Sequence, residues 1–307
     1  MRLSLAGLCL AIGFFSSPAF AEGSGAPCQM PLLASLSTLV LPGGTVEVPI
    51  TVNGRTLSLT ADTGAIVTGI SNSAVDQIGL EKHNSGYMFE LPGNVQTDKK
   101  VRVSSVRIGG ISTGETTMIV FPDFAMTGMD GLLGPDFMQN FDIEFDYAHA
   151  KFNVFAPASC PGKVVYWTKD AYAAMAMQLD EDWHVTVPVS LDGKPVTAVI
   201  DSGATHSFIT SGELEKHFGI KLNSPGMQNL GKKSINGTVA QTVYRYPFSM
   251  LTLDGVSVKN PNIEVYVDGT YHPAGPQIVI GASVLRQLRV YISYKTKTLY
   301  ATAAEAH

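Results

Sequence analysis

Two short loops of the sequence carry the same aspartate-centred pattern. Residues 62–65 read Asp-Thr-Gly-Ala, and residues 201–204 read Asp-Ser-Gly-Ala. One Asp-x-Gly after a strand is typical of an ordinary turn. Two copies in related halves mean more, because a two-fold axis between the halves would bring Asp62 and Asp201 together. Two carboxylates in contact cannot both ionise cheaply, so they share one proton and supply a base and an acid at the same pH.

Such a pair suits the hydrolysis of a peptide bond by a bound water. The ionised carboxylate takes a proton from the water, and the protonated carboxyl polarises the scissile carbonyl. This chemistry needs neither a covalent intermediate nor a metal. The sequence therefore predicts a peptide or protein substrate and no cofactor.

The elements that must position these loops are repeated along the chain. Residues 48–65 align without a gap with residues 187–204, which lie 139 positions later; six of the 18 pairs are identical and eight more are close in type. Each copy predicts a strand, a tight turn and a second strand that ends at the aspartate. The turns are Asn53-Gly54 and Asp192-Gly193, which favour a two-residue hairpin connection.

The repeat resumes after each aspartate loop. Leu-Leu-Gly at residues 132–134 matches Val-Ile-Gly at residues 279–281. The apolar spacing that follows predicts a short helix and then an alternating strand in both copies. Two further helices are expected, at residues 73–80 and 211–218.

These patterns predict a mostly β fold of two duplicated lobes related by a pseudo-two-fold axis. The segments expected along the chain are a signal peptide at 1–21, a tail at 22–34, lobe 1 at 35–158, a linker at 159–162, lobe 2 at 163–303 and a tail at 304–307.

The paired motifs resemble the active-site signatures of aspartic proteases. In that superfamily a second motif of two apolar residues and Gly follows, and here it begins 70 and 78 residues after the two aspartates. The Ala after each Gly resembles the retropepsin branch, including bacterial retropepsin-like proteins, more than the pepsins. The resemblance implies a two-lobed aspartic protease with Asp62 and Asp201 as its catalytic pair. Since both lobes lie in one chain, a monomer is expected.

The resemblance also implies roles for the neighbours of the two aspartates. Thr63 and Ser202 would form hydrogen bonds across the lobe junction. Gly64 and Gly203 would let the backbone approach each carboxylate, which a Cβ would hinder. Pepsins carry a Ser or Thr hydroxyl at the next position, where this chain has Ala65 and Ala204.

Substrate contacts are less well defined by the sequence. Residues 86–103 and 231–242 could each form a hairpin over the cleft, with tips near 92–94 and 236–237. Tyr87 fits either a flap tyrosine or an ordinary strand aromatic.

Three more residues invite interpretation. Met126 and Met129 fit either substrate subsites or core filling, because Met adapts to varied neighbours. His206 is expected to be a solvated loop residue.

The N-terminus has the layout of a secretory signal peptide. Arg2 precedes an apolar run at residues 3–15, and Ala-Phe-Ala at residues 19–21 fits a cleavage site. We therefore expect an exported protein, periplasmic or secreted, without a membrane span. Cleavage would leave Cys28 and Cys160, which predict one disulfide in an oxidising compartment; two unpaired thiols are the alternative.

Composition narrows the classes of function. Of 307 residues, 45% are hydrophobic and 15% are charged, and the formal net charge is −5. This balance disfavours binding to nucleic acid, which needs a surplus of Lys and Arg. The alternative to an active endopeptidase is a protease-fold protein without turnover that serves as a peptide-binding module or inhibitor.

Overall fold

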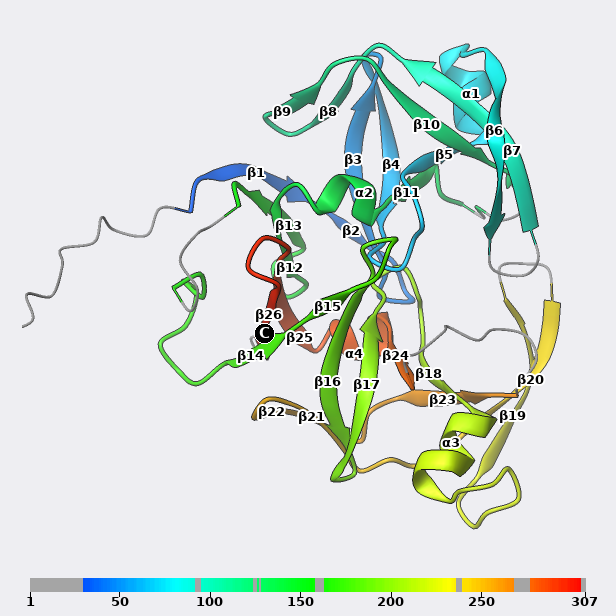
Figure 1. The fold of residues 1–307 in the computed structure, drawn as a ribbon, viewed down its shortest axis with the longest axis vertical. Helices are drawn as coiled ribbons and strands as arrows, with labels where there is room; N and C mark the ends of the chain where they lie inside the picture. Colours follow the sequence, from blue (N-terminus) through cyan, green and yellow to red (C-terminus); the bar gives the residue numbers. More distant parts are fainter. Residues whose placement is uncertain are drawn as a thin grey trace, which may run out of the picture.

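Two β lobes and a sheet shared between them make up the fold of this computed structural model (Figure 1). The structure describes residues 30–91, 95–123, 126, 128–157, 163–235, 239–267 and 277–304. The expected signal peptide, Cys28, Cys160 and both hairpin tips lie outside these residues. No helix of the described chain is long and apolar enough to cross a membrane.

Lobe 1 is built on a ten-stranded sheet with two short helices. Its elements are β2 (Leu39–Val40), β3 (Val46–Val52), β4 (Arg55–Ala61), β5 (Gly69–Ser71), α1 (Asn72–Ile78), β6 (Lys82–Leu91), β7 (Val95–Val103), β8 (Val106–Ile108), β9 (Ile111–Thr113), β10 (Thr116–Phe121), β11 (Gly131–Leu133) and α2 (Pro135–Met138).

Lobe 2 repeats this plan. Its elements are β15 (Gln178–Leu179), β16 (Val185–Leu191), β17 (Lys194–Ile200), β18 (Ser207–Thr210), α3 (Ser211–Phe218), β19 (Gln228–Ile235), β20 (Val239–Arg245), β21 (Met250–Leu253), β22 (Val256–Lys259), β23 (Ile263–Tyr266), β24 (Ile278–Ile280) and α4 (Ala282–Leu285).

The two ten-stranded sheets have matching strand orders. Lobe 1 runs β6-β7-β10-β5-β11-β4-β3-β8-β9, and lobe 2 runs β19-β20-β23-β18-β24-β17-β16-β21-β22. The short strands β2 and β15 each pair with the equivalent strand, β3 or β16. The predicted duplication and the mostly β fold class are therefore confirmed.

The hairpins that lead to the aspartates form because their turns accept left-handed backbone. Asn53 and Gly54 have φ of 48° and 83°, and Asp192 and Gly193 have φ of 47° and 78°. These values are what a tight turn between right-twisted strands requires. In both hairpins one face of the strands is apolar and enters the main core, as Val48, Ile50 and Val52 do at 0% exposure.

The six-stranded shared sheet joins the lobes. It consists of β1 (Leu32–Ser37), β13 (Lys151–Phe155), β12 (Asp142–Asp146), β25 (Leu288–Ser293), β26 (Thr298–Ala303) and β14 (Ala173–Ala176), in that order. The central pairing of β12 with β25 places Phe145 opposite Val290. Strand β1 begins at Leu32, so part of the expected N-terminal tail belongs to this sheet.

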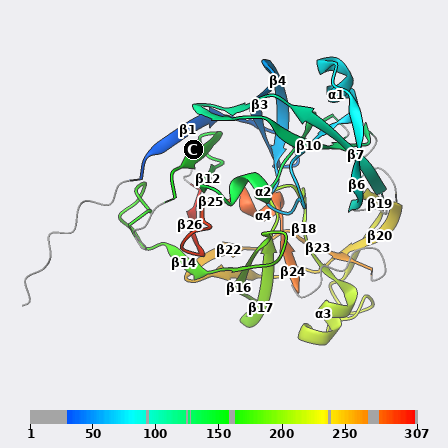
Figure 2. The ribbon, with the colours of Figure 1, turned by 45° about the horizontal axis from the view of Figure 1, so that its top comes forward.

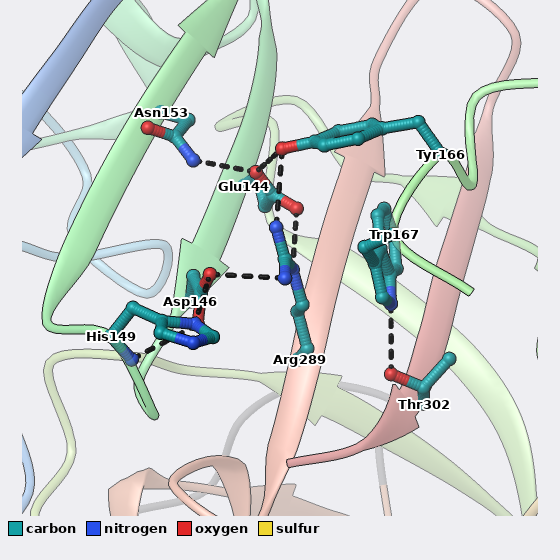
Figure 3. Close-up of polar contacts among 8 residues, drawn as sticks. All are labelled: Glu144, Asp146, His149, Asn153, Tyr166, Trp167, Arg289 and Thr302. Atoms are coloured by element: carbon teal, nitrogen blue, oxygen red, sulfur yellow. Dashed lines mark hydrogen bonds and ion pairs between the residues drawn. The ribbon is translucent and has the colours of Figure 1, made fainter. Parts of the chain in front are cut away.

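A buried ionic cluster crosses the shared sheet beside this pairing (Figure 3). Arg289 on β25 donates from Nε to Glu144 Oε1 at 2.8 Å and lies 3.1 Å from Asp146 Oδ2. The Tyr166 hydroxyl donates to Glu144 Oε2 at 2.7 Å, and the guanidinium lies 4.8 Å from the ring of Trp167. The cluster ties strand β12 to β25 and to the segment that connects the lobes.

Candidate active site

Each aspartate is held at the end of its strand by the second motif of its own lobe. Strand β11 lies parallel to β4, and β24 lies parallel to β17. The backbone N–H of Asp62 donates to the Leu133 carbonyl at 2.9 Å, and that of Asp201 donates to the Ile280 carbonyl at 3.0 Å. The apolar residues before each Gly therefore fix where the aspartates leave the sheet.

The glycines of the second motif permit close packing against the aspartate loops. A Cβ on Gly281 would lie 2.6 Å from the carbonyl oxygens of Ala204 and His206. A Cβ on Gly134 would lie 2.9 Å from the carbonyl carbon of Val67. Any side chain at these positions would push the loops away from the sheet.

Thr63 and Ser202 lock the two loops together, as the resemblance implied. The hydroxyl of Thr63 donates to the Ile200 carbonyl at 2.7 Å, and that of Ser202 donates to the Ala61 carbonyl at 2.7 Å. Both residues are buried. Each hydroxyl thus reaches the strand end of the opposite lobe.

Asp62 and Asp201 meet at this junction. A Cβ on Gly64 would lie 2.6 Å from both carboxylate oxygens of Asp201, and a Cβ on Gly203 would overlap the carboxylate of Asp62. Each carboxylate therefore rests on the glycine of the opposite loop, and only glycine fits there. Both aspartates are partly exposed, so water can reach them.

The electrostatics of the pair favour a shared proton. Burial and then the charge of Asp201 raise the pKa of Asp62 well above 3.8, against the opposing effect of the N–H groups of Gly64 and Ala65. Burial also raises the pKa of Asp201, while hydrogen bonds from Ala204, Asp62 and Gly203 oppose this shift. The two carboxyls hold one proton over a wider pH range than isolated aspartates would.

Backbone groups occupy the place of the pepsin-type hydroxyls. The N–H of Ala204 donates to Asp201 Oδ1 at 2.9 Å, next to the N–H of Gly203 at 3.1 Å. In lobe 1 the N–H of Gly64 donates to Asp62 Oδ1 at 2.9 Å. Ala65 is buried, and Ala204 packs against an apolar cluster that includes Phe208.

The three weaker substrate-contact candidates differ in placement. Tyr87 lies on β6 and is 77% exposed, so it does not fill the core as an ordinary strand aromatic would. Met126 is buried in a small cluster with Val95 of β7. Met129 is half-buried, and its sulfur accepts a hydrogen bond from Thr60 at 2.8 Å.

His206 does not have the solvated position that we expected. Its side chain is 35% exposed, and Nδ1 lies 3.5 Å from Oε1 of the fully buried Glu264. Burial lowers the pKa of His206, because desolvation outweighs the attraction of Glu264. The neighbouring Glu264, which the sequence analysis missed, could have been suspected as the one charged residue in the apolar strand β23.

The predicted hairpins are present in both lobes. Strands β6 and β7 form one, and β19 and β20 form the other. The two hairpins approach each other on the same side of the molecule in both views (Figures 1 and 2).

Among the described residues, no group of three or more His, Cys, Asp or Glu could hold a metal ion.

Comparisons with known proteins find an aspartyl protease family in each lobe. Residues 48–140 match the family described as "gag-polyprotein putative aspartyl protease", and residues 187–284 match the family described as "Aspartyl protease". The crystal structure of an aspartic proteinase from Irpex lacteus superposes with a TM-score of 0.53 at 14% identity, covering 89% of this chain and 97% of that chain. That likeness concerns the fold alone. No curated protein matches the chain.

Two duplicated β lobes that each place one aspartate at their junction define a bilobal protein of the aspartic protease class. The chain belongs to the aspartic protease superfamily.

Proposed function

We propose that this protein is an exported and catalytically active aspartic endopeptidase. The observation that carries the proposal is the complete junction: Asp62 and Asp201 each rest on the glycine of the opposite loop. A binding module without turnover is under no requirement to keep both carboxylates in one shared-proton pair. The N-terminal signal-peptide pattern supports export.

The proposed mechanism uses a water held between the two carboxyls. The ionised aspartate accepts a proton as the water oxygen bonds to the scissile carbonyl carbon, and the protonated aspartate gives its proton to the carbonyl oxygen. The tetrahedral intermediate then collapses: the C–N bond breaks as the nitrogen takes a proton from the aspartate that accepted it from the water, and one hydroxyl of the intermediate returns a proton to the other aspartate. A carboxylic acid and an amine leave, and the dyad again holds one proton.

The sheet edges support an extended peptide as substrate. Strands β6 and β19 are the terminal strands of the two lobe sheets, and their hairpins lie on the same side of the molecule (Figure 2). An edge strand offers backbone N–H and C=O groups that an extended chain can pair with. Binding along the backbone suits cleavage within a chain rather than at its end.

A peptide library tests the proposal. The mature protein is incubated with peptides of diverse sequence between about pH 3 and about pH 7, and the products are identified by mass spectrometry. This pH range includes the higher of the two pKa values of known aspartate dyads. We expect internal cleavage by the parent and by Asp170→Asn, a matched change at an exposed loop aspartate, but none by Asp62→Asn. Absence of cleavage by the parent at every pH would favour the binding module, and release of terminal residues alone would contradict endopeptidase action.

A test of export is separate. When the full-length chain is expressed, the protein recovered outside the cytoplasm should lack residues 1–21 and begin at Glu22. Retention of Met1 in protein that stays inside the cell would contradict export.

A further inference from the structure

The two lobes differ chemically at positions that their common topology makes equivalent. Strand β5 pairs with β10 so that Gly69 lies opposite Ile119, and β18 pairs with β23 so that Phe208 lies opposite Glu264. Because β5 and β18 hold the same place in the two sheets, Ile119 of lobe 1 corresponds to Glu264 of lobe 2.

A second pair of equivalent positions changes in the same way. Val67 and His206 each lie five residues after the aspartate of their own lobe. Val67 packs against the cluster that contains Ile119, and His206 lies beside Glu264. An apolar pair in lobe 1 is thus matched by an ionisable pair in lobe 2.

The lobe 1 side forms what we call the apolar patch. Its members are contributed by the sheet, the hairpin and the loop before β11, and they are Val67, Phe89, Val95, Ile119, Phe121, Met126 and Leu132. Val67, Phe89 and Leu132 are half-buried and the other four members are buried, so these three supply the accessible surface of the patch.

The lobe 2 side forms what we call the cationic cluster, made of Glu264 and the three residues around it. Oε1 of Glu264 lies 2.5 Å from Lys233 Nζ, 3.5 Å from His206 Nδ1 and 3.7 Å from Arg245 Nη2. Lys233 comes from β19 and Arg245 from β20. The lobe 1 hairpin supplies Phe89 and Val95 to the apolar patch, although Lys100 of β7 lies opposite Ile119 as Arg245 lies opposite Glu264.

Exposure decides which charge a ligand would meet. The side chain of Glu264 is 0% exposed, whereas those of Lys233 and Arg245 are 34% and 38% exposed. One buried anion cannot neutralise two permanent cations, so the accessible surface of this cluster is positive. A basic ligand would face Lys233 and Arg245, not Glu264.

The cationic cluster belongs to the face of the sheet that adjoins the dyad. On this face Ala204, whose N–H binds Asp201, packs with Phe208 and Tyr266. The rings of Phe208 and Tyr266 stack at 4.5 Å. Glu264 lies two residues before Tyr266 on β23 and so points to the same face, while Ile263 and Val265 enter the main core.

We propose that the substrate site is asymmetric: it takes an apolar side chain against the apolar patch of lobe 1 and an acidic side chain, Asp or Glu, against Lys233 and Arg245 of lobe 2. This inference rests on the proposed peptidase function. Glu264 serves as a positioning residue, since its carboxylate holds both cations at the sheet. It also neutralises part of their charge when no substrate is bound.

Matched peptides test the inference. Each peptide carries an apolar pair at its centre and one Glu, which is moved position by position to either side, and each has a twin with Gln in place of Glu. At about pH 6 a peptide Glu is ionised. We expect kcat/KM for one Glu position to exceed that of its Gln twin about tenfold, as a charge-assisted hydrogen bond allows.

Variants locate the effect. Lys233→Met and Arg245→Gln should each lower the Glu-to-Gln ratio toward one, and Lys233→Glu should invert it in favour of a peptide that carries Lys. Lys259→Met is the matched control, because Lys259 is exposed on β22 at the opposite edge of the sheet. The control should keep the parent ratio.

The outcomes separate this inference from the proposed function. Cleavage of the Gln peptides with a ratio near one at every position would overturn the acidic subsite and leave the peptidase standing. If no peptide is cleaved, binding to Asp62→Asn still decides: a Glu peptide that binds no tighter than its Gln twin overturns the subsite. A ratio that survives in both Lys233→Met and Arg245→Gln would also overturn it.

Discussion

Thr63 and Ser202 exchange hydrogen bonds in both directions across the lobe junction. The backbone N–H of Thr63 donates to the Ser202 hydroxyl at 3.0 Å, and the N–H of Ser202 donates to the Thr63 hydroxyl at 3.0 Å. Each hydroxyl also donates to a strand-end carbonyl of the other lobe. Every polar group of this exchange is paired inside the protein, so the junction is specified by both lobes together.

Removal of one hydroxyl should weaken the junction. Thr63→Val leaves the Ser202 N–H and the Ile200 carbonyl without their partner in a buried site, which should lower the free energy of unfolding by about 2 kcal/mol. Urea unfolding measures this loss. Thr56→Val, a matched change at an exposed position of β4, should alter stability by no more than about 0.5 kcal/mol. Equal stability of the two variants would contradict the role of Thr63.

The ionic cluster of the shared sheet gives a prediction on stability. Arg289→Met would leave the buried Glu144 without its cation and Asp146 with His149 as its remaining partner; the two carboxylate side chains are only 0% and 6% exposed. Breaking such a buried pair from one side costs about 3–5 kcal/mol. Arg107→Met, at an exposed position of β8, is the control. A loss below about 1 kcal/mol in Arg289→Met would show that the cluster is not needed to join the lobes.

The raised pKa of Asp62 predicts that the dyad lowers stability at neutral pH. Folding favours the protonated form of this carboxyl, so its contribution to stability is full below the ordinary value of 3.8 and is lost as the pH rises through the raised, folded-state value. Asp62→Asn imitates the neutral form. We expect this variant to have a higher Tm than the parent at pH 7, with a difference that vanishes in strong acid. A variant that is less stable than the parent at pH 7 would contradict the shift.

The same shift should set the pH profile of catalysis. Because burial and charge repulsion raise the pKa values of the pair, we expect an optimum in weak acid rather than the strongly acidic optimum of pepsins. A hydroxyl at position 65 or 204 would add a hydrogen bond to the ionised carboxylate and lower its pKa. The acidic limb of kcat/KM should therefore move to lower pH in Ala65→Ser or Ala204→Thr. An acidic limb that stays in place in both variants, with activity retained, would refute this account. The backbone N–H groups of Ala65 and Ala204 would then suffice to stabilise the ionised carboxylates.

Local signals made much of the fold predictable from the sequence. Asn53-Gly54 and Asp192-Gly193 fix the hairpins through their own backbone preferences, and the aspartate that follows each hairpin is placed by chain continuity. The meeting of Asp62 with Asp201 followed from duplication alone. None of these steps needed the path of the intervening chain.

Non-local packing explains what the sequence did not predict. The pairing of β12 with β25 joins Glu144 to Arg289 across 145 positions, and no local pattern specifies it. Glu264 stands out as the one charged residue of the apolar strand β23, but the strand pattern alone does not predict that it is fully buried. Its burial depends on Lys233, which a separate hairpin brings from 31 positions away.

The central claim is that Asp62 and Asp201 act as one shared-proton pair on a bound water. The most direct test is kcat of the parent, Asp62→Asn and Asp201→Asn on the best-cleaved peptide, with circular dichroism to show that all three are folded. Our account predicts that each variant loses activity about a thousandfold or more, because each removes either the base or the acid. A folded variant that keeps more than a few per cent of the parent kcat would contradict it.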